Sequence, residues 1–553
     1  MAPRARRIAA RLARPREAAA LAGLLVLALI LLLPPGNDAA AHLYQTEVFR
    51  SHGWRFWDNF WYAGRYSQVN YSLLYYPLAA LLGTPVVVAG SAAAAAGAFS
   101  SLVRRQWPDL ATPSALAFAL LLPLGAIVGM YPFLLGLAAA LWGLVALQRG
   151  RRALALAGAA GAALVHPLSL VFFCTVVAGL AVTASGWRRR RADRVFAGGL
   201  AALLLGTVLL GRAFTAPGAR YPFHVTDLLI ILLFCVVGAI ATRGLADQRV
   251  LQALFAAYAL LSLAVFAVPF TLGANVGRLL LVAGVPLLLL PFAARGFRPR
   301  LPMMAALGLA LFWQTLPAVA SLRVGAVERA SREDFWFPAV GFLERHHDPN
   351  YRVEVVATRH HWEALYLAER GVPLARGWYR QDDFPANAAL YAAPLTARRY
   401  RTWLRRVGVR YVLLPDDPLD YSAQSEAKRL RAGAGLPVVA RMGGWTIYEV
   451  PDATPIATPA RSITVRSMGA EALTLDVARA GVYKLRLRYT PYWRVARGKA
   501  CVARSDPWAT VLRVDRPGVV KLRFDVRLGT VVNTVLGREA TCAARRQPQV
   551  RFG

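Results

Sequence analysis

Acidic residues are scarce in this chain of 553 residues: 30 Asp and Glu stand against 65 Lys and Arg, for a formal net charge of +35. An excess of this size often indicates a nucleic-acid partner. Much of the arginine, however, lies in short clusters between long apolar segments, where the preference for positive charge on the cytoplasmic side of a membrane accounts for it. We therefore exclude a nucleic-acid partner.

Cysteines are equally few, and the four present fall into two pairs. Cys174 and Cys235 lie in apolar segments, which is typical of small buried hydrophobic side chains. Cys501 and Cys542 lie near the end of the chain, where a disulfide is expected if that region faces an oxidising compartment. Spacing alone does not decide the pairing, so this bridge stays open at the level of sequence.

Charged residues are nearly absent from the centres of the apolar segments, which argues against an ion pathway across the membrane. The segments themselves are numerous: hydrophobic residues make up 57% of the chain, and stretches of membrane-spanning length recur until about residue 320. Beyond that point the sequence is mixed, charged and rich in strand-forming residues. We therefore predict a polytopic α-helical membrane protein with a tail of roughly 230 residues.

The predicted membrane domain covers residues 18–320 and holds about eleven helices. Its first helix, 18–33, follows a basic cytoplasmic amino terminus, residues 1–17. A cleaved signal peptide is the alternative, because Ala39-Ala40-Ala41 resembles a cleavage site, but Pro34-Pro35 and the later spans favour a retained helix. The further spans are predicted at 77–102, 112–130, 132–148, 153–167, 168–186, 195–214, 225–242, 250–269, 276–294 and 301–319.

The charges between these segments alternate along the chain. Loops expected inside carry Arg104-Arg105, Arg149 with Arg151-Arg152, Arg188 to Arg191, Arg243 with Arg249, and Arg295, Arg298 and Arg300. The turns at 130–132, around 167, at 215–224 and at 270–277 hold far fewer cations. This alternation predicts a cytoplasmic amino terminus and an extracytoplasmic tail.

The first outer loop, 35–76, opens with Gly36-Asn37-Asp38 and continues to His42 and Glu47. If a helix begins after Asn37, Asp38 and His42 are four residues apart and share one face. A carboxylate and an imidazole at a membrane surface can perform proton chemistry. Alternatively, Asn37 or Asp38 caps the helix and His42 is solvated. The rest of the loop is rich in Trp and Tyr, which is typical of a headgroup interface or of a plain aromatic belt.

Polar residues beside the apolar segments fall at the predicted outer ends, the membrane face that also carries Asp38. They are His166, Arg212, Arg220, His224, Asp227, Asn275 and Arg278. This placement favours a site at the outer interface over a central translocation pore.

The tail divides into two parts. Residues 321–452 are predicted to form a small α/β domain, with strands at Arg352–Thr358, Val409–Leu414 and Trp445–Val450 and a polar aromatic loop at 377–383. Residues 453–553 read as a β-sandwich-like domain. Its strands are predicted at Ser462–Ser467, Ala472–Val477, Gly481–Tyr489, Ala509–Val514 and Val519–Val526.

This order of parts resembles the GT-C superfamily of polytopic glycosyltransferases. Within it, the chain is most similar to a bacterial membrane family labelled "6-pyruvoyl-tetrahydropterin synthase-related". The resemblance is best over 18–102, through Gly36-Asn37-Asp38, His42-Leu43-Tyr44 and Tyr75-Tyr76-Pro77-Leu78. It extends through His166-Pro167, Asn275, Arg278, Gly377-Trp378-Tyr379-Arg380-Gln381 and Val409-Arg410-Tyr411-Val412. The paired acids of many GT-C members are missing, and Asp38 stands alone.

The resemblance implies transfer of a sugar from a polyprenyl-phosphate donor to an envelope glycan, lipid or protein acceptor. This would take place at the outer face of the bacterial plasma membrane. Asp38 and His42 are the expected catalytic residues. Residues expected to bind substrate are Arg278, Asn275, His166, Arg212, Arg220, Glu47, Trp378 and Arg380. The expected partners are membrane lipids, the lipid-linked donor and the acceptor. No metal ligand is predicted, and a divalent cation is left open as a cofactor.

Two other functions are compatible with the sequence. A transporter or flippase for a lipid-linked precursor would favour repeated halves and polar groups at the membrane midplane, and neither is evident. A GT-C scaffold without activity, serving as an assembly platform, is consistent with the single acid at position 38.

Overall fold

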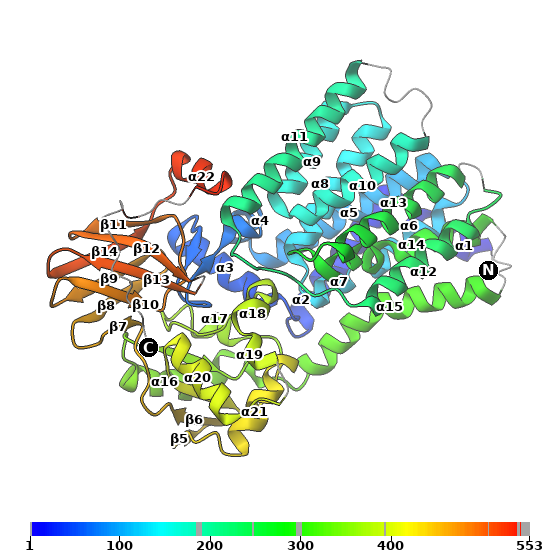
Figure 1. Ribbon diagram of the computed structural model, residues 1–553. Coiled ribbons are helices and arrows are strands. Elements are labelled where there is room, and N and C mark those ends of the chain that lie inside the picture. The colour runs from blue at the N-terminus through cyan, green and yellow to red at the C-terminus, as the bar shows by residue number, and fades with distance from the viewer. Residues whose placement is uncertain are drawn as a thin grey trace. The chain divides into compact units, whose positions relative to one another are not determined.

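The computed structural model describes residues 3–183, 191–245, 248–294, 301–391, 394–506, 508–538 and 542. The chain forms two compact units (Figure 1). Unit 1 comprises Met1–Gly53, Tyr71–Val208 and Ala219–Glu328, and unit 2 comprises Trp54–Asn70, Leu209–Gly218 and Arg329–Gly553. The predicted basic positions Arg188 to Arg190, Arg295, Arg298 and Arg300 lie outside the described residues.

Unit 1 is a bundle of apolar helices. In the described ranges, eight candidate segments are long and apolar enough to cross a membrane, which indicates a membrane protein. They are α2 (Pro15–Leu32), α5 (Thr84–Gln106), α6 with α7 (Ala111–Leu121 and Leu124–Val128), α8 (Tyr131–Gln148), α11 (Arg191–Phe214), α13 (Gln248–Ala267), η2 with α14 (Gly273–Gly277 and Arg278–Ala294) and α15 (Leu301–Gly325).

Three predicted spans are shorter than the others. Helices α9 (Arg152–Val165), α10 (Pro167–Thr183) and α12 (Val225–Ala241) are apolar but contain 14, 17 and 17 residues. A helix needs about 20 residues to cross the hydrocarbon core. Each predicted span is therefore helical in its described residues, while eight segments reach the length and composition needed to cross a membrane. Three further helices complete the unit: α1 (Pro3–Leu12), α3 (Ala39–His52) and α4 (Tyr75–Leu82).

Small residues bring neighbouring helices close together. A Cβ atom on Gly97 of α5 would lie 3.2 Å from the Pro15 carbonyl oxygen, and one on Gly158 of α9 would lie 2.6 Å from Cα of Gly143 in α8. Packing of this kind drives helix association where lipid removes the hydrophobic contribution. The sequence therefore places glycine where the α2–α5 and α8–α9 contacts require it.

Helix α14 contains Pro286, which cannot donate a hydrogen bond to the carbonyl of Val282. Gln314 of α15 supplies the missing partner. Its Nε2 donates to the Val282 carbonyl at 3.4 Å, and its Oε1 accepts from the Val285 amide at 3.4 Å. A buried glutamine in an apolar helix thus satisfies the Val282 carbonyl, which the proline leaves without its intrahelical bond.

The first domain of unit 2 is a four-stranded sheet with the order β3-β4-β6-β5. Its strands are β3 (Arg352–Val355), β4 (Val409–Pro415), β5 (Val438–Met442) and β6 (Trp445–Glu449). β3 and β4 are parallel, and the other pairs are antiparallel. The core lies between this sheet and the helices α20 (Ala397–Val407) and α21 (Gln424–Arg431). The unit also contains α16 (Phe337–His346), α17 (Glu363–Tyr366), α18 (Arg380–Ala386) and α19 (Ala388–Tyr391).

The second domain of unit 2 consists of two four-stranded sheets with the orders β12-β13-β10-β7 and β11-β14-β9-β8. The strands are β7 (Ala457–Thr458), β8 (Ile463–Gly469), β9 (Ala472–Val477), β10 (Gly481–Leu485), β11 (Trp493–Arg497), β12 (Ala500–Asp506), β13 (Ala509–Val514) and β14 (Gly518–Phe524), and α22 (Leu528–Val535) follows. A disulfide joins Cys501 and Cys542, whose Cα atoms are 5.8 Å apart. The strand-rich region therefore has the two sheets of a sandwich.

Residues 54–70 differ from the prediction, which assigned them to a loop of the membrane domain. They include the short strands β1 (Trp57–Asp58) and β2 (Arg65–Tyr66) and pack within unit 2. The buried Arg65 explains this placement. Its Nε donates to Asp382 Oδ2 at 3.2 Å, and Arg488 NH1 donates to Asp382 Oδ1 at 2.9 Å. One carboxylate thus joins the loop, α18 and the β-sandwich.

Candidate functional site

Four residues predicted for the site meet in unit 1. They are the expected catalytic residues Asp38 and His42 and the expected substrate-binding residues His166 and Arg278. Asp38 stands immediately before α3, His166 lies between α9 and α10, and Arg278 opens α14. The Arg278 guanidinium lies 3.5 Å from Asp38 Oδ2 and 3.5 Å from His166 Nε2. The side chains of Asp38 and Arg278 are 11% and 13% exposed, so the ion pair is largely withdrawn from water but still accessible.

The carboxylate of Asp38 does not cap α3. The residue occupies the N-cap position, but its side chain makes no capping hydrogen bond, and its backbone is helical at φ −94° and ψ −2°. The simple capping interpretation required a bond to the first turn of the helix. The carboxylate instead faces Arg278.

Two glycines fix the backbone around Asp38. A Cβ atom on Gly36 would lie 1.8 Å from the Ile127 carbonyl oxygen. Gly129 has φ +91°, and a Cβ atom there would lie 2.9 Å from the amide nitrogen of Asp38. The Asp38 amide donates to the Val128 carbonyl at 3.2 Å. The end of α7 is therefore pressed against the start of α3, which only glycine permits at these two positions.

His42 lies one helical turn after Asp38, as the spacing predicts, and its amide donates to the Asp38 carbonyl at 3.3 Å. Its ring is surrounded by Tyr71, Tyr75, Tyr76 and Tyr131, with ring centroids 5.3 to 6.2 Å away. Nδ1 is 3.4 Å from the Tyr76 hydroxyl. Burial, with a further contribution from the Arg278 charge, lowers the pKa of His42 to about 3. The imidazole is therefore neutral near pH 7, and the solvated histidine of the alternative interpretation is not found.

His166 links α9 to α10 because Pro167 begins the second helix. Its ring packs edge-on against Tyr71 and Phe133 at centroid distances of 5.3 and 5.5 Å. A Cβ atom on Gly136 of α8 would lie 3.1 Å from the His166 Cβ atom, so α8 approaches closely here. His166 Nδ1 has no hydrogen-bond partner within the described part of the chain. A buried imidazole nitrogen of this kind can accept a bond from a ligand.

Four other residues predicted to bind substrate lie outside this cluster. Glu47 accepts hydrogen bonds from Arg50 at 2.5 Å and Ser51 at 2.9 Å on the same helix. Asn275 is half-buried in η2, and Arg220 is exposed. Arg212 is exposed on the part of α11 that belongs to unit 2.

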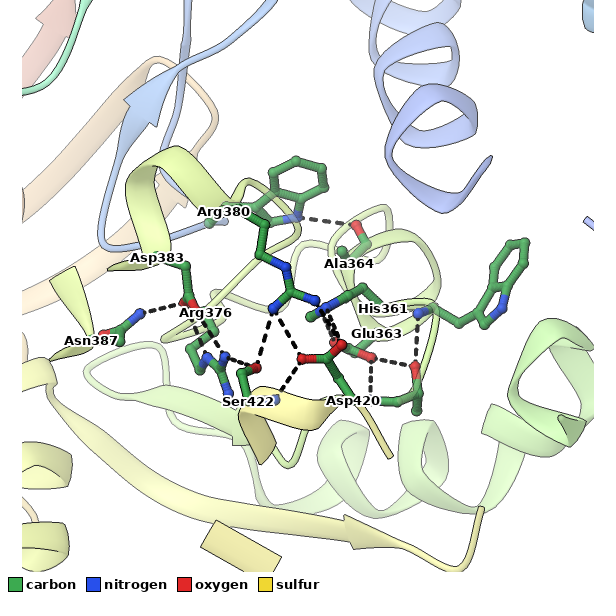
Figure 2. A network of polar contacts seen from close by, with 12 residues as sticks. His361, Glu363, Ala364, Arg376, Arg380, Asp383, Asn387, Asp420 and Ser422 are labelled. Carbon is green, nitrogen blue, oxygen red and sulfur yellow. Dashed lines mark hydrogen bonds and ion pairs between the residues drawn. The ribbon is translucent and has the colours of Figure 1, made fainter. Parts of the chain in front are cut away.

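Trp378 and Arg380 lie in unit 2, and Arg380 belongs to the buried polar network shown in Figure 2. Arg380 donates to both oxygens of Asp420, at 2.9 and 2.6 Å. Arg376 pairs in the same way with Asp383, at 3.1 and 2.9 Å, and both arginines contact Ser422. Burial opposes the charge of Asp383, but Arg376 outweighs it and lowers the pKa of this carboxyl. Arg380 is thus engaged by Asp420 in a network that orders the α/β domain.

Sequence reasoning missed part of the cluster around Arg278. Tyr71 packs edge-on against the His166 ring at a centroid distance of 5.3 Å, and Phe133 lies under the guanidinium at 5.6 Å from the ring centroid. In the sequence, Tyr71 is one of the many aromatic residues of the 35–76 loop, which indicates only an interfacial position. Two features of the sequence could have indicated these tyrosines. Tyr71 lies close to Tyr75 and Tyr76, and Tyr131 lies in a predicted outer turn.

The cluster can hold an anion and exchange a proton. Arg278 is a permanent cation, and Asp38 is a carboxylate beside it. Neutral imidazoles and tyrosine hydroxyls supply further hydrogen bonds. This donor set does not fit a divalent cation, because a single carboxylate is already opposed by a guanidinium. Within the described ranges, no group of three or more His, Cys, Asp or Glu side chains could hold a metal ion.

A scan of the chain against protein-family models finds no matching family, and a search of curated proteins finds no match.

Proposed function

We propose that the protein is a membrane glycosyltransferase that takes its sugar from a polyprenyl-phosphate donor and works at the outer face of a bacterial plasma membrane. The observation that carries the proposal is the partly accessible Asp38–Arg278 pair at the ends of apolar helices. A lipid-linked phosphate requires a cation at the end of an apolar surface. Transfer of its sugar requires a base beside that cation.

In the proposed reaction, the acceptor hydroxyl attacks the anomeric carbon of the sugar. The bond between that carbon and the phosphate oxygen breaks, and the hydroxyl proton passes to Asp38. The leaving polyprenyl phosphate keeps the bonding electron pair, and Arg278 stabilises its charge. In the free protein Arg278 neutralises Asp38 at 3.5 Å. A bound phosphate competes for the guanidinium, which leaves the carboxylate more basic at the moment when it must accept a proton.

His42 and His166 have supporting roles. His42 is neutral near pH 7 because burial lowers its pKa to about 3, so it adds no positive charge to the site. His166 lies 3.5 Å from the guanidinium and holds it toward Asp38. Both rings also exclude water from the ion pair, which strengthens electrostatic contacts with a transition state.

The test is a set of variants in the full-length protein reconstituted in lipid vesicles. Transfer of labelled sugar from a panel of polyprenyl-phosphate pentoses and hexoses to an envelope fraction is measured. We expect Asp38→Asn to lower turnover by about two to four orders of magnitude, the range for loss of a general base. Arg278→Gln should instead weaken binding of unglycosylated polyprenyl phosphate by at least about tenfold. Glu47→Gln changes a carboxylate on α3 outside the cluster and should behave as wild type.

A double variant separates catalysis from structure. Removing one partner of a buried ion pair costs about 3–5 kcal/mol, because the other charge is left without compensation. Asp38→Asn with Arg278→Gln removes both charges and should regain thermal stability but not activity. If the double variant transfers sugar at the wild-type rate, or if the wild type binds no polyprenyl phosphate, the proposal is wrong.

A further inference from the structure

Helix α22 (Leu528–Val535), which follows the last strand of the sandwich, exposes its apolar side chains. Leu528, Val532 and the C-cap residue Leu536 are 81%, 47% and 57% exposed. They are spaced four residues apart and therefore form one stripe. A surface helix of a globular domain normally turns such a stripe toward the core. The described part of the chain leaves this stripe uncovered.

The opposite side of α22 is polar and holds the helix in place. Thr530 is 8% exposed and accepts a hydrogen bond from Arg494 NH2 of β11 at 2.5 Å. Thr534, one turn later, is half-buried and donates to the Thr530 carbonyl at 2.7 Å. The polar contacts thus fix the orientation of the helix, and the apolar stripe is turned away from the sandwich.

Tyr492, two residues before Arg494, contacts the end of a candidate membrane-spanning helix. Tyr492 Oη donates to the Ala213 carbonyl at 3.2 Å, and its ring stacks on Phe214 at a centroid distance of 5.1 Å. Ala213 and Phe214 are the last residues of α11 (Arg191–Phe214). Leu205 and Val208 of that helix are 58% and 65% exposed, as expected of a helix in contact with lipid. Helix α22 therefore lies beside the point where α11 leaves its apolar stretch.

We propose that α22 is a membrane-surface anchor whose stripe of Leu528, Val532 and Leu536 inserts into the lipid headgroup region next to the end of α11. The occupant is the bilayer itself, because Arg494 holds α22, and Tyr492, two residues before Arg494, contacts the end of a candidate membrane-crossing helix. Arg538 after the helix and Arg527 before it are exposed and suit anionic headgroups, although Arg527 also donates to Asp525 at 2.8 Å. This anchor would limit rotation of the sandwich relative to the membrane surface.

The test uses the full-length protein in nanodiscs of phosphatidylcholine with a minor fraction of phosphatidylglycerol. In a Cys174→Ala, Cys235→Ala background, Val532→Cys is labelled with an environment-sensitive fluorophore, and lipids carrying a nitroxide quencher are added. Asn533→Cys is the matched control, because it is exposed on the same helix but about 100° away from Val532. Ser467→Cys on β8 gives the baseline, since β8 lies three strands from β11 in the sheet, a separation of about 14 Å.

We expect lipid quenchers to reduce the emission at position 532 at least about twofold more than at position 533. Quenching at position 467 should be lower still. Replacing phosphatidylglycerol by phosphatidylcholine should weaken the quenching at position 532. Equal quenching at positions 532 and 467 would overturn the proposal. So would concentration-dependent cross-linking of two copies through Val532→Cys without lipid quenching, because a second copy would then cover the stripe.

Discussion

The position of the Asp38 carboxylate depends on two glycines in different segments, Gly36 before α3 and Gly129 after α7. Neither glycine contacts a ligand or carries a functional group. Both permit a backbone approach that any side chain would obstruct. The geometry of the proposed base is therefore set by residues that chemical reasoning about acids and cations does not select.

Gly129→Ala tests this dependence. Its φ of +91° disfavours alanine, and the new Cβ atom would lie 2.9 Å from the Asp38 amide nitrogen. We expect a loss of about 1–3 kcal/mol in stability and a shift of Asp38 that lowers transfer activity at least about tenfold. Gly150→Ala is the matched control, since Gly150 has φ +75° but nothing lies within 4 Å of its Cβ position. Thermal unfolding and turnover are measured for both. Equal activity of the two variants would contradict the role of Gly129.

The sequence alone predicts that Asp38 and His42 are neighbours, because residues four apart in a helix share one face whatever the rest of the fold. It also placed Arg278 and His166 at the same ends of the spans. The 3.5 Å contact between Arg278 and Asp38 joins residues 240 positions apart, and no periodicity encodes it. The tyrosines around His42 were not predicted as part of the site. A loop rich in tyrosine has the same composition whether its rings lie at the headgroup interface or surround a histidine.

Strand β3 differs from its predicted form. Alternation over Arg352–Thr358 predicted a strand, and the observed strand ends at Val355, with Arg352, Val353, Glu354 and Val355 all buried. The strand lies at the edge of the sheet with both faces covered, so its charged residues are enclosed. Arg352 donates from NH1 to the Val407 carbonyl at 2.9 Å, and burial lowers its pKa to about 9. Alternation identifies a strand, but it does not reveal whether the polar face is covered.

Glu354 makes β3 sensitive to pH. Neither carboxyl oxygen has a hydrogen-bond partner among the residues that the structure describes, and burial raises its pKa well above 4.5. Its neutral form is therefore the folded one. The unfolded chain ionises above about pH 4.5, so stability is fully present below that value and falls as pH rises, by up to about 1.4 kcal/mol per pH unit. We expect Glu354→Gln to flatten this decline above about pH 4.5 in calorimetric unfolding of the full chain.

The control is Glu344→Gln on α16, where the carboxylate is exposed. It should keep the wild-type decline of stability with pH. If Glu354→Gln declines as steeply as the wild type, the carboxyl is already ionised in the folded protein and the assignment is wrong.

The bounds of a strand are predicted more closely from the sequence where turns flank a short alternating segment. β9 (Ala472–Val477) and β13 (Ala509–Val514) have their predicted bounds. Strands β5, β7, β11 and β12 were missed, because β5 is largely exposed and β11 and β12 carry bulges in their pairing. Such strands are defined by the neighbour they pair with rather than by their own pattern.

Unit 2 is assembled from three separate segments of the chain, and this could not be predicted from composition. Trp57 and Trp61 look like interfacial aromatics in the sequence but are fully buried in unit 2. The last residues of α11 also belong to this unit through Phe214 and Tyr492. A segment that begins as a candidate span therefore ends as part of the folded tail domain.

Helix α11 connects the charge pattern to the topology. Its amino end carries Arg191 and Arg194, and its carboxyl end packs in unit 2. If the cationic end lies in the cytoplasm, a helix of 24 residues brings unit 2 to the opposite side. The Cys501–Cys542 disulfide belongs to unit 2, and the bond would persist only if that side is an oxidising compartment.

This orientation is tested by thiol accessibility in intact cells, in the Cys174→Ala, Cys235→Ala background. Ser467→Cys reports on unit 2, and Asp109→Cys reports on the turn after Arg104-Arg105 without removing a cation; both positions are exposed. We expect a membrane-impermeant reagent to label position 467 in intact cells and position 109 only after permeabilisation. The reverse pattern would place unit 2 in the cytoplasm, where the disulfide would be reduced. Because α11 ends within unit 2, that result would also remove the argument that the Asp38–Arg278 pair serves an extracytoplasmic acceptor.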